Sequence, residues 1–278
     1  MTTKELYEFG CLQLKAAEIS EYRLDARLLL ETATGISYAE FLSNPEEEVA
    51  KEEEALYSEM ISKRAERIPL QHITKKQGFM GLDFNVSPDV LIPRQDTETL
   101  VEEVLKDLHD GMSILDMCTG SGCIILSLLN YSNDTKGVGA DVSEAALSIA
   151  SENAKELGLA ERCCFLKGDL FENISGKFDI LVSNPPYIRT EEIASLMPEV
   201  RNHDPFIALD GREDGLYFYK RIISEAAPFL KRGSLTAFEI GNDQGEAVSK
   251  LMIDAGYKEV TVINDLCNNA RVVKGYFS

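Results

Sequence analysis

Apolar residues recur at two different spacings along this chain of 278 residues. Up to about residue 66 they return every three or four positions, as on one face of an α-helix, and Gly35 and Asn44-Pro45 interrupt the pattern. The recurring residues are Leu6, Phe9, Leu12, Leu24, Leu28, Leu56 and Met60. We therefore predict a small all-helical domain over residues 1–70, which contains no set of catalytic side chains.

Beyond residue 70 the apolar residues recur at shorter intervals. Residues 71–88 alternate apolar and polar positions around Gly78 and Gly81, which predicts a β-hairpin that links two domains. From residue 89 to residue 278, short apolar runs alternate with helical patterns, and this order is typical of an α/β domain with a parallel sheet. The last two strands are predicted over residues 234–240 and 260–263.

The stretch most informative for chemistry is Asn184-Pro185-Pro186-Tyr187, which follows the apolar run 178–183. The run is typical of a buried parallel strand, and two prolines cannot donate ladder hydrogen bonds, so the chain leaves the sheet at Asn184. Ligands of open α/β sheets bind at such strand ends. The prolines hold the Asn184 amide and the Pro185 carbonyl as a rigid pair of acceptors, with the Tyr187 ring beside them. This arrangement suits a planar NH2 group, whereas the alternative interpretation is an ordinary strand-ending turn.

A glycine-rich loop supports the first interpretation. The short strand pattern 113–117, with Asp116 near its end, runs into a turn with two glycines and then into an apolar helix, as in a Rossmann-like sheet. The loop differs from a dinucleotide fingerprint, because Ile125 stands where a small residue is needed and Asp116 would repel a pyrophosphate. The cofactor is therefore predicted to be adenosine-like, free of phosphates and positively charged, which fits S-adenosylmethionine. The loop residues predicted to bind it are Cys118, Thr119, Gly120, Ser121 and Gly122.

Two further acids follow the next predicted strands. Asp141 ends the second strand and is predicted to accept hydrogen bonds from the ribose hydroxyls. Asp169 follows the third strand and is predicted to accept from the adenine amino group, with Leu170 against the ring. A single strand-end aspartate is commonly just a solvated residue, but the repetition after successive strands indicates one shared site.

With these residues, the chain resembles the HemK/PrmC family of protein N5-glutamine methyltransferases, which modify the glutamine of the Gly-Gly-Gln motif in peptide-chain release factors. The matching segments are Pro69 to Ile73, Phe79 to Gly81, Leu91 to Glu98, Asp116 to Gly122, Asp141, Asn184 to Ile188, Ala208 to Gly211, Asp214 to Leu216, Glu239 to Gly241 and Asp243 to Gly245. Asn-Pro-Pro-Tyr is shared with adenine and other amino-group methyltransferases, so it specifies only the acceptor chemistry. The segment Ile92 to Glu98 and the helical N-terminal region narrow the resemblance to this family.

The resemblance implies a class I S-adenosylmethionine-dependent methyltransferase domain over residues 89–278, preceded by the helical domain and the hairpin. It implies that Asn184 and Pro185 position the substrate amide, that Pro186 and Tyr187 complete the substrate cradle, and that the Tyr187 ring packs on the amide plane. Phe79, Arg94 and Thr97 are expected to close over the cofactor. The helical domain is expected to bind the release factor; the alternative is a bundle that only stabilises the catalytic domain.

The charge balance limits the partners. The chain has 28 basic and 47 acidic residues, a formal net charge of −19, which opposes general affinity for nucleic acid. A nucleic-acid adenine N6-methyltransferase is therefore disfavoured. A non-enzymatic cofactor-binding scaffold is disfavoured because the cradle residues are intact. A ribosomal-protein glutamine methyltransferase stays open, since it differs mainly in its partner.

Cysteine and histidine usage indicates no metal site. The six cysteines form no C-x-x-C pair, and the three histidines are scattered along the chain, so we expect reduced thiols. No apolar run reaches about 18 residues, and no basic segment precedes an apolar stretch at the N-terminus. We therefore expect a cytoplasmic protein that contacts no membrane. The family resemblance implies peptide-chain release factors as its partners, and we expect the enzyme to be a monomer.

Overall fold

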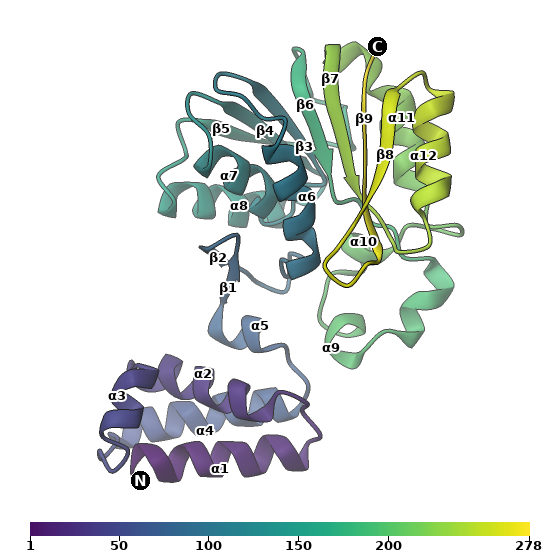
Figure 1. Cartoon of the computed structure of the whole chain (residues 1–278). Helices are drawn as coiled ribbons and strands as arrows, with labels where there is room; N and C mark the ends of the chain where they lie inside the picture. Colours follow the sequence, from purple (N-terminus) through teal and green to yellow (C-terminus); the bar gives the residue numbers. More distant parts are fainter. The chain divides into compact units, whose positions relative to one another are not determined.

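The computed structural model describes residues 1–278 and divides into two compact units (Figure 1). The first, here called the helical unit, contains Met1–Lys76 together with Met197–His203. The second, the sheet unit, contains Gln77–Leu196 and Asp204–Ser278. The units thus divide between residues 76 and 77, whereas the sequence pattern placed boundaries after residues 70 and 88. No pattern in the sequence indicated that residues 197–203 belong with the helices.

The helical unit is built from helices around one apolar core, as predicted, but the residues of that core differ from the predicted ones. Of the apolar residues named for the pattern only Leu6 is buried, whereas Leu12, Leu24 and Leu56 are exposed. Its elements are α1 (Thr3–Ala16), α2 (Tyr22–Thr34), α3 (Tyr38–Ser43), α4 (Lys51–Ala65), α5 (Leu70–Thr74) and the inserted α9 (Pro198–Arg201). The core is formed by Leu6, Leu14, Leu29, Tyr57, Ile61 and their neighbours, all buried. Buried Arg64 donates from Nε to Asp25 at 2.7 Å, and Glu199 of α9 accepts from Arg64 and Arg67.

A hairpin of β1 (Lys76–Phe79) and β2 (Leu82–Asn85) begins the sheet unit. Its two turn residues, Met80 and Gly81, have φ angles of 51° and 70°, the left-handed values that a two-residue hairpin turn requires. Glu98 accepts from the Met80 N–H at 2.6 Å, and the Tyr131 hydroxyl donates to the Met80 carbonyl at 2.6 Å. The hairpin prediction is correct in kind but began too early, because residues 70–74 form helix α5.

The sheet unit contains a seven-stranded sheet in the order β5-β4-β3-β6-β7-β9-β8. Its strands are β3 (Ser113–Met117), β4 (Lys136–Asp141), β5 (Cys163–Lys167), β6 (Phe178–Ser183), β7 (Leu230–Glu239), β8 (Lys258–Asn264) and β9 (Ala270–Tyr276). Strands β3 to β7 run parallel, and β9 is antiparallel to both β7 and β8. The chain proceeds from β3 to β4 and β5 on one side and then to β6 and β7 on the other, so the strand order reverses beside β3.

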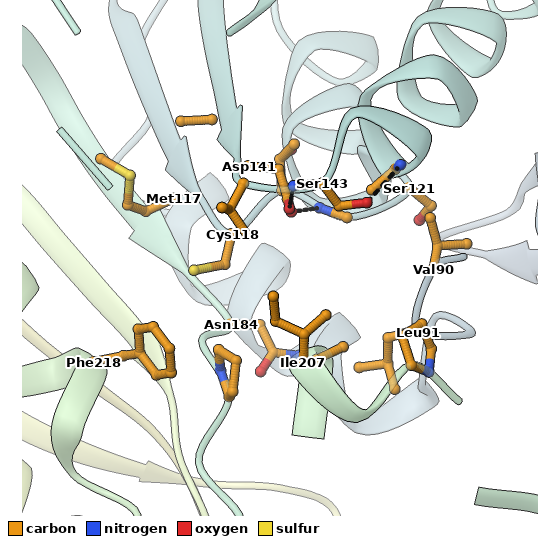
Figure 2. A pocket seen from close by; sticks show the side chains of 18 of the residues that line it. Val90, Leu91, Met117, Cys118, Ser121, Asp141, Ser143, Asn184, Ile207 and Phe218 are labelled. Carbon is orange, nitrogen blue, oxygen red and sulfur yellow. Dashed lines mark hydrogen bonds between the residues drawn. The ribbon is translucent and has the colours of Figure 1, made fainter. Parts of the chain in front are cut away.

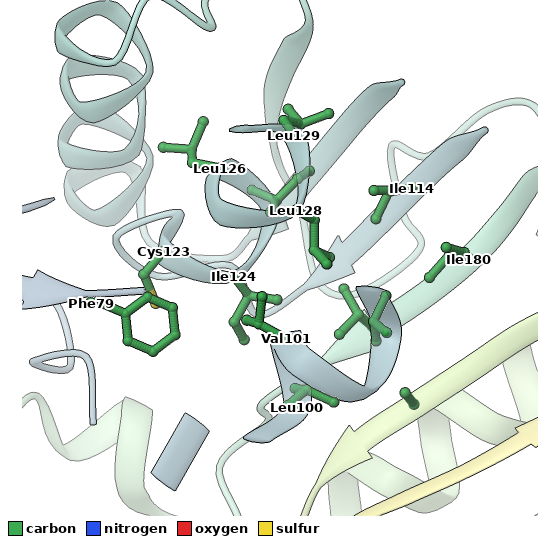
Figure 3. Close-up of a cluster of buried hydrophobic side chains, with 14 of the residues drawn as sticks. Phe79, Leu100, Val101, Ile114, Cys123, Ile124, Leu126, Leu128, Leu129 and Ile180 are labelled. Atoms are coloured by element: carbon green, nitrogen blue, oxygen red, sulfur yellow. The ribbon is translucent and has the colours of Figure 1, made fainter. Parts of the chain in front are cut away.

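Helices cover both faces of this sheet. They are α6 (Gln95–Leu105), α7 (Cys123–Asn130), α8 (Glu144–Glu156), α11 (Tyr217–Glu225) and α12 (Gly245–Asp254). The sheet unit also contains the short helix α10 (Phe206–Leu209) and the 3₁₀ turns η1 (Thr190–Ser195) and η2 (Ala227–Phe229). Figure 3 shows one of the two apolar layers, in which Leu100 and Val101 of α6 meet Ile124 and Leu128 of α7. The architecture confirms the predicted Rossmann-like α/β fold. None of the helices combines the length and apolar character needed to cross a membrane.

Candidate active site

A cavity of about 290 Å³ lies at the carboxyl ends of the parallel strands of the sheet unit. It is bordered by the residues that follow β3, β4, β5 and β6, where the strand order reverses, and this is the usual ligand site of open α/β sheets. The strand ends are in register, since Met117 pairs with both Ala140 and Ser183. In Figure 2 the loop with Cys118 and Ser121, together with Asp141 at the end of β4, lies on one side of the cavity, and Asn184 and Ile207 lie on the other.

The loop after β3 is held in a left-handed conformation. Cys118, Gly120 and Gly122 have φ angles of 60°, 55° and 78°. A Cβ atom added to Gly120 would meet no atom within 4 Å, so glycine is needed there for its left-handed backbone angle and not for lack of space. A Cβ atom on Gly122 would lie 3.2 Å from the Ala150 Cβ, so this glycine also allows α7 and α8 to approach closely.

Two aspartates, Asp116 and Asp141, accept hydrogen bonds from residues of this loop. Asp116 is fully buried and accepts from the Thr119 hydroxyl at 2.6 Å, and burial raises its pKa to about 7. Asp141 accepts from the Gly120 N–H and the Ser143 N–H, both at 2.9 Å, and burial raises the pKa of its carboxyl as well. Of the two carboxylates, only that of Asp141 borders the cavity.

Asp169 and Leu170 border the cavity after β5. Both Asp169 oxygens accept from Arg221 Nη1, at 2.8 and 2.9 Å, and Leu170 is buried with a φ angle of 52°. The carboxylate therefore faces a guanidinium that the sequence pattern did not connect with it. Carboxylate oxygens accept more than one hydrogen bond, so the ion pair leaves capacity for another donor.

Asn184 is positioned by helix α6. Its Nδ2 donates to the Thr97 hydroxyl at 3.3 Å, and Thr97 and Asn184 both border the cavity. Because the NH2 group is used in this bond, Oδ1 is the part of the amide left to act as an acceptor. Arg94, at the start of the same helix, also borders the cavity and donates to buried Asp204 at 2.5 Å.

Tyr187 is turned away from the cavity. Its hydroxyl donates to Glu239 Oε1 at 3.2 Å, and its backbone carbonyl accepts from Gln244 Nε2 at 3.0 Å. A Cβ atom on Gly211 would lie 2.7 Å from the Tyr187 Cα, and one on Gly215 would lie 2.4 Å from the Tyr187 carbonyl oxygen. The backbone of Tyr187 is thus surrounded by Gly211, Gly215 and the segment Glu239 to Gln244.

Comparison with known proteins gives the family. Residues 5–74 match the PrmC N-terminal domain, and residues 94–199 match the methyltransferase small domain. The chain is 44% identical over 266 residues to the release factor glutamine methyltransferase of Caulobacter vibrioides, covering 95% of this chain and 92% of that relative. It is 41% identical over 280 residues to the protein of that name from Moorella thermoacetica, covering 99% of each. The chain belongs to the release factor glutamine methyltransferase family.

A solved structure agrees at the level of the fold. A methyltransferase from Pyrococcus furiosus superposes with a TM-score of 0.55 at 19% identity, covering 77% of this chain and 98% of that one. The resemblance proposed from the sequence is therefore confirmed, as is the class I methyltransferase fold.

Most of the residues expected at the cofactor site of this methyltransferase lie around one cavity. Those that border it are Arg94, Thr97, Cys118, Thr119, Gly120, Ser121, Asp141, Asp169, Leu170 and Asn184. Three do not border it. Asp116 lies beneath the loop, Gly122 begins α7, and Phe79 packs edge-on against Phe84 in the apolar core, with ring centroids 6.1 Å apart. The expectation that Phe79 closes over the cofactor is wrong, because the hairpin turn directs its ring inward.

The substrate cradle also needs a correction. Asn184 and Pro186 border the cavity of this methyltransferase, whereas Pro185 and Tyr187 do not. The predicted stacking of the Tyr187 ring on the substrate amide does not fit this placement, because the hydroxyl points to Glu239 inside the protein. Sequence reasoning overlooked several other residues at the rim of the cavity. They are Asp89, Leu91, Ser143, Ile207, Arg212, Tyr217, Phe218 and Arg221. Tyr217, Phe218 and Arg221 lie on helix α11, and the others lie in loops, at the start of α8 or in the four-residue helix α10.

Proposed function

We propose that this protein transfers a methyl group from S-adenosylmethionine to the side-chain amide nitrogen of the glutamine in the Gly-Gly-Gln motif of peptide-chain release factors. The observation that carries the proposal is the position of Asn184. Asn184 Nδ2 donates to the Thr97 hydroxyl, which leaves Asn184 Oδ1 available as an acceptor. Asn184 follows β6 and borders the same cavity as the glycine loop and Asp141. Family membership supplies the identity of the substrate class.

The residues around the cavity fit S-adenosylmethionine. Each oxygen of Asp141 accepts one backbone N–H and keeps lone-pair capacity for a ribose hydroxyl. Leu170 and Ile124 provide apolar contact for an adenine ring. The cofactor supplies an electrophilic methyl group carried on a sulfonium.

The protein's own groups prepare the acceptor. An amide nitrogen is a poor nucleophile because its lone pair is delocalised into the carbonyl. Asn184 Oδ1 and the Pro185 carbonyl accept the two N–H hydrogens of the substrate amide, which orients its lone pair and stabilises the positive charge that develops on nitrogen. The proton leaves after methyl transfer, so the transfer itself needs no protein base.

The remaining assignments extend the proposal to the whole chain. The helical unit binds the release factor outside the Gly-Gly-Gln motif, and the enzyme acts as a monomer without contacting nucleic acid directly. The match of residues 5–74 to the PrmC N-terminal domain supports a role of the helical unit particular to this family, and the net charge of −19 opposes direct contact with nucleic acid.

The test offers competing substrates to the same protein. Purified release factors, ribosomes and DNA are incubated separately with the enzyme and methyl-labelled S-adenosylmethionine, and peptide mass spectrometry locates the label. We expect one added methyl group on the glutamine of the Gly-Gly-Gln peptide. Label on a ribosomal protein alone would support the alternative glutamine methyltransferase, and label on a nucleic-acid base would contradict the proposed substrate.

A further inference from the structure

Arg221 of α11 binds the carboxylate of Asp169 at the rim of the cavity. Its Nη1 donates to both Asp169 oxygens, at 2.8 and 2.9 Å, and joins two residues that are 52 positions apart. Both residues border the cavity, together with Tyr217 and Phe218 of α11, and Figure 2 shows Phe218 across the cavity from Asp141. The ion pair therefore connects the segment after β5 to a helix that also borders the cavity.

Arg221 is held in place by its own helix. Its Nε donates to Glu225, one turn further along α11, at 2.9 Å. Helix α11 is in turn fixed against the apolar core, because Tyr219 and Ile222 are completely buried and the Tyr219 hydroxyl donates to the Glu239 carbonyl at 2.7 Å. A planar guanidinium held in this way presents its remaining N–H groups in a fixed direction.

The Asp169 carboxylate depends on Arg221 for its orientation. The Asp169 side chain is 58% exposed, and Arg221 Nη1 is the donor that binds it within the protein. Exposed ion pairs contribute little to folding stability, so the main consequence of this pair is geometric. A carboxylate that could otherwise turn about its side-chain bonds is held at the rim of the cavity, with lone pairs left for a further donor.

We propose that Arg221 is a positioning residue that holds the Asp169 carboxylate for the amino group of the cofactor's adenine, and thereby favours adenine over purines that lack this group. The inference rests on the cofactor of the function proposed above and on Asp169 as the acceptor that the sequence predicts. The amino group donates and the carboxylate accepts, so the two are complementary. Without Arg221, the exposed carboxylate would lose its rotational freedom only when the cofactor binds, and this cost would weaken the hydrogen bond.

The test measures the binding of two ligands that differ only in this amino group. They are S-adenosylhomocysteine and its analogue with hydrogen in place of the 6-amino group, and titration calorimetry gives the Kd of each for the full-length protein. Both ligands carry the same charge, so the ratio of the two Kd values is insensitive to the charge that a substitution removes. We expect wild-type protein to bind S-adenosylhomocysteine about 10-fold more tightly than the analogue, because the missing hydrogen bond is one to a charged group.

Substitutions on either side of the ion pair should reduce this ratio. Arg221→Met removes the donors and keeps an apolar stem, so we expect the ratio to fall to about 3-fold or less. Asp169→Ala removes the acceptor and should abolish the preference. Adding Arg221→Met to Asp169→Ala should cause no further change in the ratio, because both residues act through one hydrogen bond.

Arg212→Met is the matched control. Arg212 also borders the cavity, and its guanidinium carbon lies 5.9 Å from the centroid of the Tyr217 ring, as that of Arg221 does. Arg212 pairs with Asp210 instead of Asp169, so Arg212→Met should keep the wild-type ratio.

The outcomes separate the inference from the proposed function. A wild-type ratio in Arg221→Met, an equal fall in Arg212→Met, or equal binding of both ligands by the wild type would overturn the inference. If Arg221→Met does not fold, Glu225→Ala decides, because it removes the support of Arg221, and an unchanged ratio would again overturn the inference. Wild-type protein that shows the expected ratio but does not methylate release factor would contradict the proposed function alone.

Discussion

At the scale of single residues, the activity depends on which atoms of a few side chains face the cavity. Asn184 borders it with an amide whose NH2 end is already bonded to Thr97. Asp116, which was expected to face the cofactor, lies below the loop and bonds to Thr119 instead. Polar residues close together in the sequence thus divide into those that border the cavity and those that hold the loop beside it.

Substitution of Asn184 should separate acceptor geometry from cofactor binding. Asn184→Ala removes one of the two proposed acceptors and leaves the glycine loop unchanged, so kcat should fall on the order of 10²–10³-fold, as when an oxyanion-hole donor is lost. Asn184→Asp keeps an acceptor and should retain partial activity. Single-turnover rates and calorimetry with the cofactor measure the two effects. Full activity in Asn184→Ala would refute the mechanism.

Asp116 should make stability depend on pH in the cofactor-free protein. Burial raises its pKa from 3.8 to about 7 in the folded state, so folding favours the protonated form. This stabilisation is fully present below about pH 4, the unfolded-state value, and is lost as the pH rises toward 7. Asp116→Asn removes this dependence. Urea unfolding at pH 4.5, 6 and 7.5 should therefore show the wild type losing stability relative to the variant, and a constant difference would argue against the shifted pKa.

At the scale of elements, the loop between β3 and α7 combines two demands on glycine. Gly120 needs only a left-handed backbone, while Gly122 needs that backbone and also room beside α8. The two positions therefore differ in what an added methyl group would meet, although both lie in one short loop.

The pair Gly120→Ala and Gly122→Ala tests this difference. Gly120→Ala should cost about 1–2 kcal/mol of unfolding free energy, the strain of a left-handed alanine. Gly122→Ala should cost more, because its methyl group would lie 3.1 Å from Leu126 Cδ1 and 3.2 Å from Ala150 Cβ. Chemical denaturation of both variants gives the comparison. Equal losses would mean that the helices can move apart without cost.

At the scale of the whole molecule, the chain passes between its two units more than once. Residues 197–203 leave the sheet unit, and Glu199 within them is bound by Arg64 and Arg67 of the helical unit. Arg64 is buried and also bonds to Asp25, so Glu199 completes an ion-pair group inside the helical unit.

Removal of the helices should affect substrate binding more than cofactor binding. A chain lacking residues 1–66 should keep most of its affinity for S-adenosylmethionine, because every residue that borders the cavity belongs to the sheet unit. Its KM for intact release factor should rise, while its kcat/KM for a short Gly-Gly-Gln peptide should change little. The deletion also removes Arg64, one of the two arginines that bind Glu199, so full-length Glu199→Gln serves as the matched control. Unchanged kinetics on intact release factor would show that the helical unit is structural only.

The sequence by itself determined the features that depend on neighbouring residues. Helical and strand spacing indicated both units, and the glycine loop and the Asn-Pro-Pro-Tyr stretch marked the strand ends that form the cavity. Strand β9 was missed, because an antiparallel strand among parallel ones depends on its partners β7 and β8. The boundary at α5 was also missed. The tertiary structure alone decided the direction of side chains, turning Phe79 into the core and Tyr187 toward Glu239. It also brought Thr97 to Asn184, 87 residues away, and such contacts leave no periodic signal in a single sequence.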